Sequence, residues 1–275
     1  MSGDGRTLLA RPDLADRRLQ GRRRAMAFAE PRPFRCRAPF AAIRKAPDLR
    51  GEQENQLLYG EVFDVLEESR EWAWGQARRD GYVGYVALGA LGALDGLPSH
   101  RVRALRTYGF ERPDKKSCFI GPFSLNALVR ARGEPQGGFV DGGSAGWIFA
   151  AHLAPAGVFD GDPAAVAERH LGAPYLWGGR DSQGLDCSGL VQQALYACGR
   201  ACPRDADQQL AFFDREVPRG ELRRGDLAFW PDHVAMMLDG ERLIHATSRF
   251  MAVAVEPLAD AAQAIGREPI AFRRP

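Results

Sequence analysis

Residues 184–190 read Gly-Leu-Asp-Cys-Ser-Gly-Leu, and the apolar residues that follow recur at the spacing of one helix face. Asp186 is a residue type that caps helix N-termini, and Gly199 suits the left-handed residue that ends a helix. The pattern predicts a helix beginning at Cys187, where the positive end of the helix dipole favours a thiolate, which is a competent nucleophile. The alternative is that Cys187 is a small buried apolar residue.

Two histidines lie downstream, on either side of Asp239-Gly240. The flanking segments are apolar, and Asp-Gly between two such segments is a strong hairpin signal. A two-residue loop would place His233 and His245 on opposite faces of the hairpin. A three-residue loop over 238–240 would place them directly opposite each other, with Cβ atoms about 5 Å apart. We expect the three-residue loop, in which one imidazole is a base and the other orients it. The alternative is that His245 only fills a strand face.

Four sequence blocks in this part of the chain occur in the order found in one enzyme family. The blocks are Pro174-Tyr175-Leu176-Trp177-Gly178-Gly179, Gly184-Leu185-Asp186-Cys187-Ser188-Gly189-Leu190, Asp232-His233-Val234 and Leu243-Ile244-His245-Ala246. Together they resemble the NlpC-type papain-like cell-wall peptidases. The resemblance implies that residues 157–275 form an α+β papain-like cysteine peptidase domain. A helix over residues 160–171 is expected to open this domain.

The resemblance also implies roles for individual residues. Cys187 would be the nucleophile, His233 the base and His245 the residue that orients the base. Tyr175 would lie by the oxyanion site beside the backbone N–H of Cys187, whereas Trp177 is expected to pack in the core. The residues expected at the oxyanion and substrate site are Tyr175, Asp186, Ser188, Arg204, Asp205, Tyr82 and Glu61.

The stretch over residues 203–209 resembles the Arg-Asp-Ser segment of the subgroup that cuts peptidoglycan stem peptides after γ-D-glutamate. The resemblance implies that Asp205 binds the free amine of the terminal L-alanine. The subgroup's serine is Ala206 here, so that hydroxyl contact is lost. The alternative is that Asp205 caps a helix ending near Phe213.

Composition limits the remaining possibilities. The chain has 275 residues, a net charge of +2 and five cysteines without paired Cys-x-x-Cys sets. The charge gives no indication of nucleic-acid binding, and the cysteines indicate neither a zinc ribbon nor a disulfide framework. A metal hydrolase would need a further ligand at helical spacing beside Cys187 and the histidines. We therefore expect no metal and no cofactor.

The first 37 residues hold ten arginines and no apolar stretch of signal-peptide length. We expect residues 1–35 to form a partly disordered arm with a short helix near residues 13–20. The alternative is an arm that touches anionic lipid or wall polymer. Because no run approaches about 20 apolar residues, no membrane span is expected, and the expected location is the cytoplasm.

Upstream of the peptidase domain, short strands are predicted at residues 40–44, 61–67, 72–78 and 82–86. Gly-Tyr-Val-Gly-Tyr-Val at residues 81–86 resembles a bacterial SH3-like module. The predicted architecture is therefore two small all-β SH3-like barrels. Residues 36–97 would form the first barrel and residues 98–156 a degenerate second copy.

The subgroup implies a further role for the first barrel, in which a tyrosine closes the far end of the substrate pocket. Tyr82 is the candidate and Glu61 is a second one. The alternative for Tyr82 is that it packs in the barrel core.

These features predict hydrolysis of the γ-D-glutamyl–diamino acid bond in peptidoglycan-derived peptides, L-Ala-γ-D-Glu-diamino acid, with a free N-terminal L-Ala. The expected role is recycling of murein peptides. The alternatives are a wall-binding module with an inactive catalytic domain, and another amidase or acyl-transfer activity. The presence of Cys187, His233 and His245 argues against an inactive domain.

Overall fold

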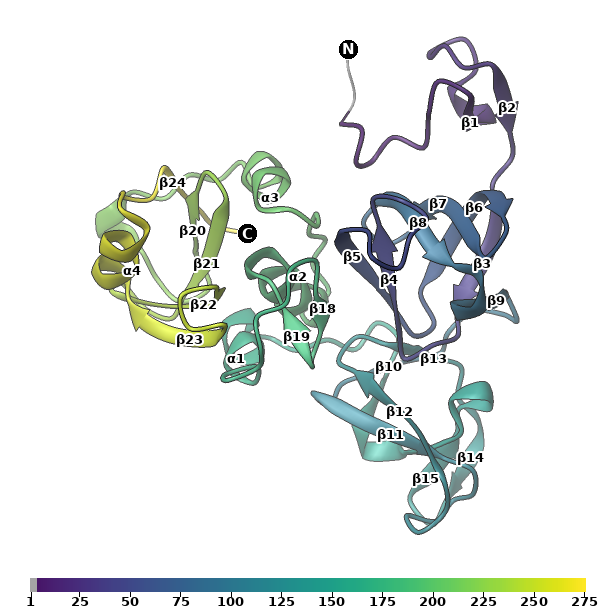
Figure 1. Ribbon diagram of the computed structural model, residues 1–275. Coiled ribbons are helices and arrows are strands. Elements are labelled where there is room, and N and C mark those ends of the chain that lie inside the picture. The colour runs from purple at the N-terminus through teal and green to yellow at the C-terminus, as the bar shows by residue number, and fades with distance from the viewer. Residues whose placement is uncertain (1–3) are drawn as a thin grey trace. The chain divides into compact units, whose positions relative to one another are not determined.

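The computed structural model describes residues 4–275 (Figure 1). The chain divides into two compact units, Met1–Ala156 and Gly157–Pro275. In the described part of the first unit, the regular elements are strands and short 3₁₀ helices. The second unit combines α-helices with an antiparallel sheet, and it is α+β.

The N-terminal arm differs from the predicted short helix. Leu14–Asp16 (β1) and Ala27–Ala29 (β2) form a parallel pair, and the only helical turn between them is a 3₁₀ helix at Arg17–Leu19 (η1). Asp16 caps this turn, because its side chain accepts a hydrogen bond from the backbone N–H of Arg18 at 2.8 Å. The strand pairing uses the backbone groups that a longer helix would need.

The first part of unit one is a seven-stranded antiparallel sheet with the order β5-β4-β8-β7-β6-β3-β9. Its strands are Arg32–Cys36 (β3), Phe40–Arg44 (β4), Gln53–Leu58 (β5), Val62–Ser69 (β6), Trp72–Ala77 (β7), Val83–Ala87 (β8) and Leu91–Ala93 (β9). A 3₁₀ helix, Leu88–Ala90 (η2), connects the last two strands. Across the described residues no pairing joins β5 to β9, so the sheet is not the closed barrel that was expected. Because β3 begins at Arg32, the sheet also begins before residue 36.

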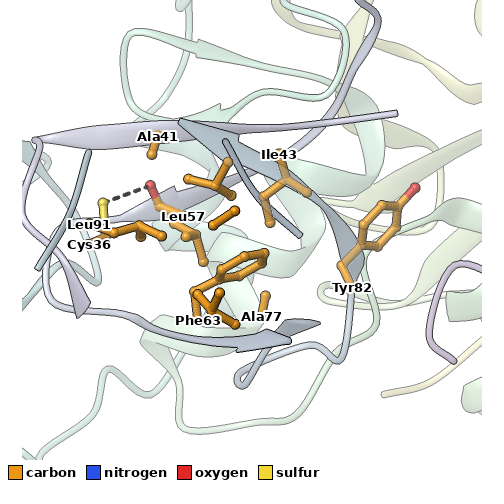
Figure 2. Packing of buried hydrophobic residues seen from close by; sticks show 11 residues of the cluster. Cys36, Ala41, Ile43, Leu57, Phe63, Ala77, Tyr82 and Leu91 are labelled. Atoms are coloured by element: carbon orange, nitrogen blue, oxygen red, sulfur yellow. Dashed lines mark hydrogen bonds between the residues drawn. The ribbon is translucent and has the colours of Figure 1, made fainter. Parts of the chain in front are cut away.

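One hydrophobic cluster forms the core of this sheet (Figure 2). Ile43, Leu57 and Phe63 are fully buried in it, and they come from three different strands. Such burial contributes about 1.5–3 kcal/mol for each large apolar side chain. Tyr82 belongs to the same cluster, with its hydroxyl at the edge of the group of side chains drawn (Figure 2).

The rest of unit one forms two smaller antiparallel sheets with the orders β13-β10-β17 and β12-β11-β16-β15-β14. Their strands are His100–Val102 (β10), Arg106–Phe110 (β11), Phe119–Ser124 (β12), Leu128–Val129 (β13), Arg132–Gln136 (β14), Phe139–Asp141 (β15), Trp147–Phe149 (β16) and Leu153–Pro155 (β17). Gly143–Ala145 (η3) and Ala150–His152 (η4) are 3₁₀ helices. A second hydrophobic cluster lies here, and Tyr59 packs in it against Phe123 with ring centroids 4.7 Å apart.

The second unit is built around a five-stranded antiparallel sheet with the order β23-β22-β21-β20-β24 (Figure 1). Its strands are Leu227–Trp230 (β20), His233–Met237 (β21), Arg242–Thr247 (β22), Ala252–Pro257 (β23) and Ala271–Arg273 (β24). Its helices are Pro163–Glu168 (α1), Cys187–Ala197 (α2), Ala206–Phe212 (α3), Leu258–Ile265 (α4) and the 3₁₀ helix Arg219–Glu221 (η5). Arg180–Asp181 (β18) and Gly184–Leu185 (β19) form a small hairpin just before α2. Helix α2 packs against β21 and β22, which brings its first residue toward the strands that carry the histidines.

Helix α1 is shorter than the predicted helix over 160–171. Asp162 caps it by accepting hydrogen bonds from the backbone N–H groups of Ala164 and Ala165, and Pro163 occupies its first position. The cap fixes the start of the helix at Pro163, three residues later than predicted.

Within residues 4–275, no helix combines the length and the apolar character that crossing a membrane requires.

Candidate active site

Cys187 is the first residue of α2, as the sequence predicts. The side chain of Asp186 caps the helix and accepts a hydrogen bond from the backbone N–H of Gly189 at 2.7 Å. Helix α2 ends at Ala197, and Gly199 follows in the left-handed conformation with φ of 73°. Both helix boundaries predicted from the sequence are therefore confirmed.

Burial decides the protonation of the Cys187 thiol. Burial raises the pKa of this thiol to about 12, and the negative charge of Asp186 acts in the same direction. Backbone N–H groups of Ser188 and Val234 face the sulfur and oppose the rise in pKa. Burial thus opposes the effect of the helix terminus, which the sequence predicts to favour a thiolate. The sulfur needs a base that removes its proton.

The two histidines lie on the same face of the β21–β22 hairpin. Nε2 of His233 is 2.8 Å from Nδ1 of His245, which is hydrogen-bond distance. The proximity predicted from the sequence is confirmed, whereas the predicted register is wrong. Met236 pairs with Ile244 and Met237 with Leu243, so the three-residue loop is 239–241 and not 238–240.

This register makes the two histidines diagonal neighbours. Its continuation places His233 level with Thr247, and it places His245 level with Ala235. Side chains two residues apart along a pair of strands share a face, and long or aromatic side chains reach across the diagonal of about 7–8 Å. A shift of two residues in register therefore keeps the imidazoles in contact, whereas a shift of one would separate them.

Both imidazoles are neutral at neutral pH. Burial lowers the pKa of His233 to about 4, although the charge of Asp186 acts in the opposite direction. Burial, together with the nearby His233 and Arg249, lowers the pKa of His245 to about 3. A neutral imidazole has a lone pair that accepts a proton, which is what a buried thiol requires.

A buried ion pair lies directly behind the nucleophile. Nη2 of Arg204 is 2.6 Å from Oδ2 of Asp186, and Nη1 is 2.9 Å from Oδ1, so the contact is bidentate. Nη1 also donates to the hydroxyl of Ser188 at 2.9 Å, and the Arg204 side chain is only 1% exposed. Arg204, Asp186 and Ser188 are thus bonded to one another, and their expected role at the oxyanion and substrate site stays a prediction.

Tyr175 and Trp177 take positions different from each other. Tyr175 is half-buried, and burial together with the nearby Cys187 raises the pKa of its phenol. Its electrostatic interaction with Cys187 agrees with a place near the nucleophile. Trp177 is 59% exposed, so the expectation that it packs in the core is wrong.

Asp205 takes the position that the alternative interpretation gave it. It is the N-cap of α3 and shares a capping box with Gln208, whose Oε1 accepts a hydrogen bond from the backbone N–H of Asp205 at 3.2 Å. The carboxylate is half-buried, one residue from the buried Arg204. A second role toward an amine stays a prediction.

The two candidates in unit one are both buried. Tyr82 is 2% exposed and packs in the hydrophobic cluster of its sheet, which is the alternative interpretation. Glu61 accepts a hydrogen bond from the backbone N–H of Leu58 at 3.0 Å and pairs with Arg79 at 2.9 Å. Its carboxylate therefore stabilises the turn between β5 and β6. For both residues, a role toward a ligand stays a prediction.

Sequence reasoning missed one charged residue beside the histidines. Oε1 of Glu256 lies 2.8 Å from Nε2 of His245, and Arg249 contacts the other oxygen of Glu256 at 2.9 Å. The available signal was a single acidic residue in an otherwise apolar strand, Ala-Val-Ala-Val-Glu-Pro at 252–257. In the part of the chain that the structure describes, no group of three or more His, Cys, Asp or Glu side chains is arranged to hold a metal ion.

Comparison with known proteins places this geometry in a family. Residues 172–263 match the NlpC/P60 family. The second unit is an NlpC/P60 domain. Residues 43–91 match the bacterial dipeptidyl-peptidase Sh3 domain, so an SH3-like domain lies in the first unit.

Two curated relatives match part of the chain. Dipeptidyl-peptidase 6 of Lysinibacillus sphaericus is 37% identical over 82 residues, which are 30% of this chain and 30% of that protein. Gamma-D-glutamyl-L-lysine dipeptidyl-peptidase of Bacillus subtilis (strain 168) is 37% identical over 84 residues, which are 28% of each protein. The match thus spans less than a third of the length of either relative.

A solved structure shares the fold over most of the chain. It is an NlpC/P60 family protein from Bacillus cereus, with a TM-score of 0.77 and 18% identity. The alignment covers 88% of this chain and 99% of that one. The likeness therefore includes both the NlpC/P60 domain and elements of the first unit.

The buried ion pair predicts a large effect on the stability of the NlpC/P60 domain. Arg204→Met leaves the buried carboxylate of Asp186 without its partner, which typically costs about 3–5 kcal/mol. We expect hydrogen exchange of the α2 amides to accelerate accordingly. The matched control is Arg224→Met, because Arg224 pairs with Asp162 and Glu168 at the surface. Such exposed pairs contribute about 0–1 kcal/mol. If Arg204→Met lowers the stability of the domain no more than Arg224→Met does, the stabilising role of the Arg204 pair is contradicted.

Proposed function

We propose that this chain is a cysteine peptidase that hydrolyses the γ-D-glutamyl–diamino acid bond of peptidoglycan-derived peptides with a free N-terminal L-Ala. The observation that carries the proposal is the packing of α2, which begins with Cys187, against β21 and β22, whose residues His233 and His245 are 2.8 Å apart. The name of the B. subtilis relative, a gamma-D-glutamyl-L-lysine dipeptidyl-peptidase, supports this choice of bond.

The proposed mechanism begins with transfer of a proton from Cys187 to His233. Because Nε2 of His233 contacts His245, Nδ1 is the nitrogen left to accept the thiol proton. The sulfur then attacks the γ-carbonyl carbon of D-glutamate, and the electron pair of the C=O bond moves to the oxygen. The tetrahedral intermediate collapses, the C–N bond breaks, and His233 gives the proton to the leaving amine.

A water molecule completes the cycle. His233 removes a proton from the water, the hydroxide attacks the thioester carbon, and the C–S bond breaks to release the dipeptide acid. The proton returns to the sulfur, so the enzyme ends in its starting state. The oxyanion of each intermediate would accept a hydrogen bond from the backbone N–H of Cys187, which lies among the N–H groups without helical partners at the start of α2. Tyr175 is proposed to lie beside this oxyanion.

Specificity for a free amine is assigned to Asp205. The neighbouring Arg204 is fixed to Asp186, which directly precedes the nucleophile. This connection supports a constant distance between the Asp205 carboxylate and the sulfur, as a dipeptide of fixed length requires. Peptides with a free L-Ala amine arise once wall fragments lose their sugar, so we propose that the substrates are recycled fragments and that the enzyme acts in the cytoplasm.

The first unit is proposed to contain two SH3-like modules, residues 36–97 and residues 98–156. Two hydrophobic clusters support the presence of two modules, with Leu58 and Tyr59 of the first module packing in the second cluster. The match to an Sh3 domain covers residues 43–91 within the first module.

Incubation with L-Ala-γ-D-Glu-diaminopimelate tests the proposed reaction. We expect release of L-Ala-D-Glu, detected by liquid chromatography with mass spectrometry, and loss of this activity in Cys187→Ala. Cys118→Ala is the matched control, because Cys118 is an exposed cysteine of the first unit. A chelator should leave the rate unchanged. Full activity in Cys187→Ala, or inhibition by a chelator that zinc reverses, would overturn the proposed chemistry.

Asp205→Asn tests the recognition of the amine without removing the helix cap, because Asn also caps helices well. Loss of a desolvated charge pair costs about 2–5 kcal/mol, which corresponds to a roughly 30- to several-thousand-fold lower kcat/KM for the free-amine peptide. The N-acetylated peptide should be a poor substrate of both forms. The matched control is Asp207→Asn, an exposed residue in the first turn of α3. Equal wild-type rates on free and acetylated peptides would contradict the amine-binding role.

The acid limb of the pH–rate profile follows from the low pKa of His233. His233 accepts the thiol proton only when it is neutral, so kcat/KM should fall only as the pH drops through about 4. An ordinary histidine would give this fall near about 6.5. We expect kcat/KM to vary less than about twofold between pH 7 and pH 6, where the α-amine of the substrate stays mostly protonated. Tryptophan fluorescence at each pH controls for unfolding, and a half-maximal rate near 6.5 would contradict burial of a neutral base.

A further inference from the structure

We propose that Glu256 is a positioning residue for the catalytic pair, and that it fixes which nitrogens of His245 and His233 carry protons. The inference rests on the proposed function for its kinetic consequence. The observation behind it is the 2.8 Å contact between Oε1 of Glu256 and Nε2 of His245, both in the interior of the second unit.

The three side chains form a diagonal across three adjacent strands. On β22, His245 lies level with Ala254 of β23, and Glu256 lies two residues further along, level with Leu243. His233 of β21 lies two residues from the level of His245 in the opposite direction along the strand. Each step shifts by two residues and keeps the side chains on one face. The sheet thus builds a continuous row from base to carboxylate.

The role of His233 toward Cys187 determines which nitrogens in this row carry protons. To accept the thiol proton at Nδ1, His233 must carry its own proton on Nε2, where it faces Nδ1 of His245. That Nδ1 must then be unprotonated, so His245 carries its proton on Nε2 and presents it to Glu256. A carboxylate accepts hydrogen bonds and donates none, so only this arrangement of protons satisfies all three groups.

Arg249 is the group that supports the ionised form of Glu256. Burial raises the pKa of the Glu256 carboxyl, and Asp260 of α4 acts in the same direction, whereas Arg249 contacts Oε2 at 2.9 Å and opposes the rise. On the side of His245, the neighbouring charged and titratable groups are His233 and Arg249. A buried carboxylate is costly unless it has partners. Its two oxygens are shared between Arg249 and His245.

The contact with His245 is short but not in line with a ring N–H. Nε2 of His245 has no well-aligned hydrogen-bond acceptor even though Oε1 lies 2.8 Å away. Hydrogen bonds of catalytic groups are often poorly aligned before substrate binds. The proposed hydrogen bond therefore requires Oε1 to move into line with the Nε2 proton of His245.

Glu256→Gln is the decisive variant. It replaces a carboxylate, whose two oxygens both accept hydrogen bonds, by an amide of the same shape, which has one accepting oxygen and one donating NH₂ group. Arg249 can only donate, so it selects the amide oxygen and leaves the amide NH₂ facing Nε2 of His245. The amide then donates to Nε2, and the proton of His245 moves to Nδ1. His233 must respond by carrying its proton on Nδ1, which blocks the nitrogen that serves as the base.

Nitrogen-15 NMR of the imidazoles reads these protonation patterns without any substrate. We expect protons on Nε2 of both His233 and His245 in the wild type, and on Nδ1 of both in Glu256→Gln. Asp260→Asn is the matched control, since it removes an exposed negative charge near Glu256 and leaves the His245 contact intact. It should keep the wild-type pattern. Unchanged protonation in Glu256→Gln, in a variant that unfolds like the wild type, would overturn the proposal.

Kinetics of the L-Ala-γ-D-Glu-diaminopimelate reaction gives the second readout. Partners that orient a functional histidine typically contribute about 10–100-fold, so we expect kcat of Glu256→Gln to fall by that factor with KM nearly unchanged. A fall in kcat with wild-type protonation would indicate a merely structural role and overturn the proposal. If the wild type does not cleave this peptide, the proposed function fails, while the NMR result still decides the role of Glu256.

Discussion

The buried ion pair between Asp186 and Arg204 is the interaction on which the site depends. Asp186 also accepts hydrogen bonds from the backbone N–H groups of Gly178 and Gly189, so one carboxylate joins the preceding loop to the start of α2. Each of these contacts is charge-assisted and therefore stronger than a bond between neutral groups. Because Cys187 follows Asp186 directly, the network that holds the carboxylate also positions the sulfur against β21.

The electrostatics of the site follow from this packing. The helix terminus and backbone N–H groups favour a thiolate at Cys187, but burial and the Asp186 charge favour a thiol. Burial likewise keeps His233 and His245 neutral. In the proposed mechanism the resting state is therefore a neutral thiol and a neutral base, and proton transfer to His233 precedes attack on the substrate. The proposed row of side chains across β21, β22 and β23 would determine the direction of that transfer.

Local sequence signals predicted the elements, but they did not predict how side chains are shared between them. The Asp186 cap and Gly199 gave both ends of α2, because each signal is local: the Asp186 side chain bonds the first turn of the helix, and Gly199 adopts the left-handed conformation that follows its end. The hairpin was predicted with its loop one residue early, since Asp-Gly suits more than one turn. The even shift in register preserved the His233–His245 contact.

Tertiary contacts explain what the sequence could not predict. The sequence does not show that Arg204 pairs with Asp186 in the interior of the domain. It also does not show that Tyr82 packs in the core of its sheet. Glu256 was not predicted because its partner, His245, lies on the neighbouring strand, two residues from the position directly opposite Glu256. The sequence does not determine this register. In unit one, the polar β5 strand and the short β3 and β9 strands gave weak periodic signals.

Trapping the acyl-enzyme tests most directly whether Cys187 is the nucleophile. The protein is mixed with excess L-Ala-γ-D-Glu-diaminopimelate, quenched in acid within milliseconds to seconds, and analysed by intact mass and peptide mapping. We expect an L-Ala-D-Glu acyl group attached through a thioester to Cys187, which hydroxylamine removes. Substrate turnover without any adduct on Cys187, or the same turnover in Cys187→Ala, would contradict it.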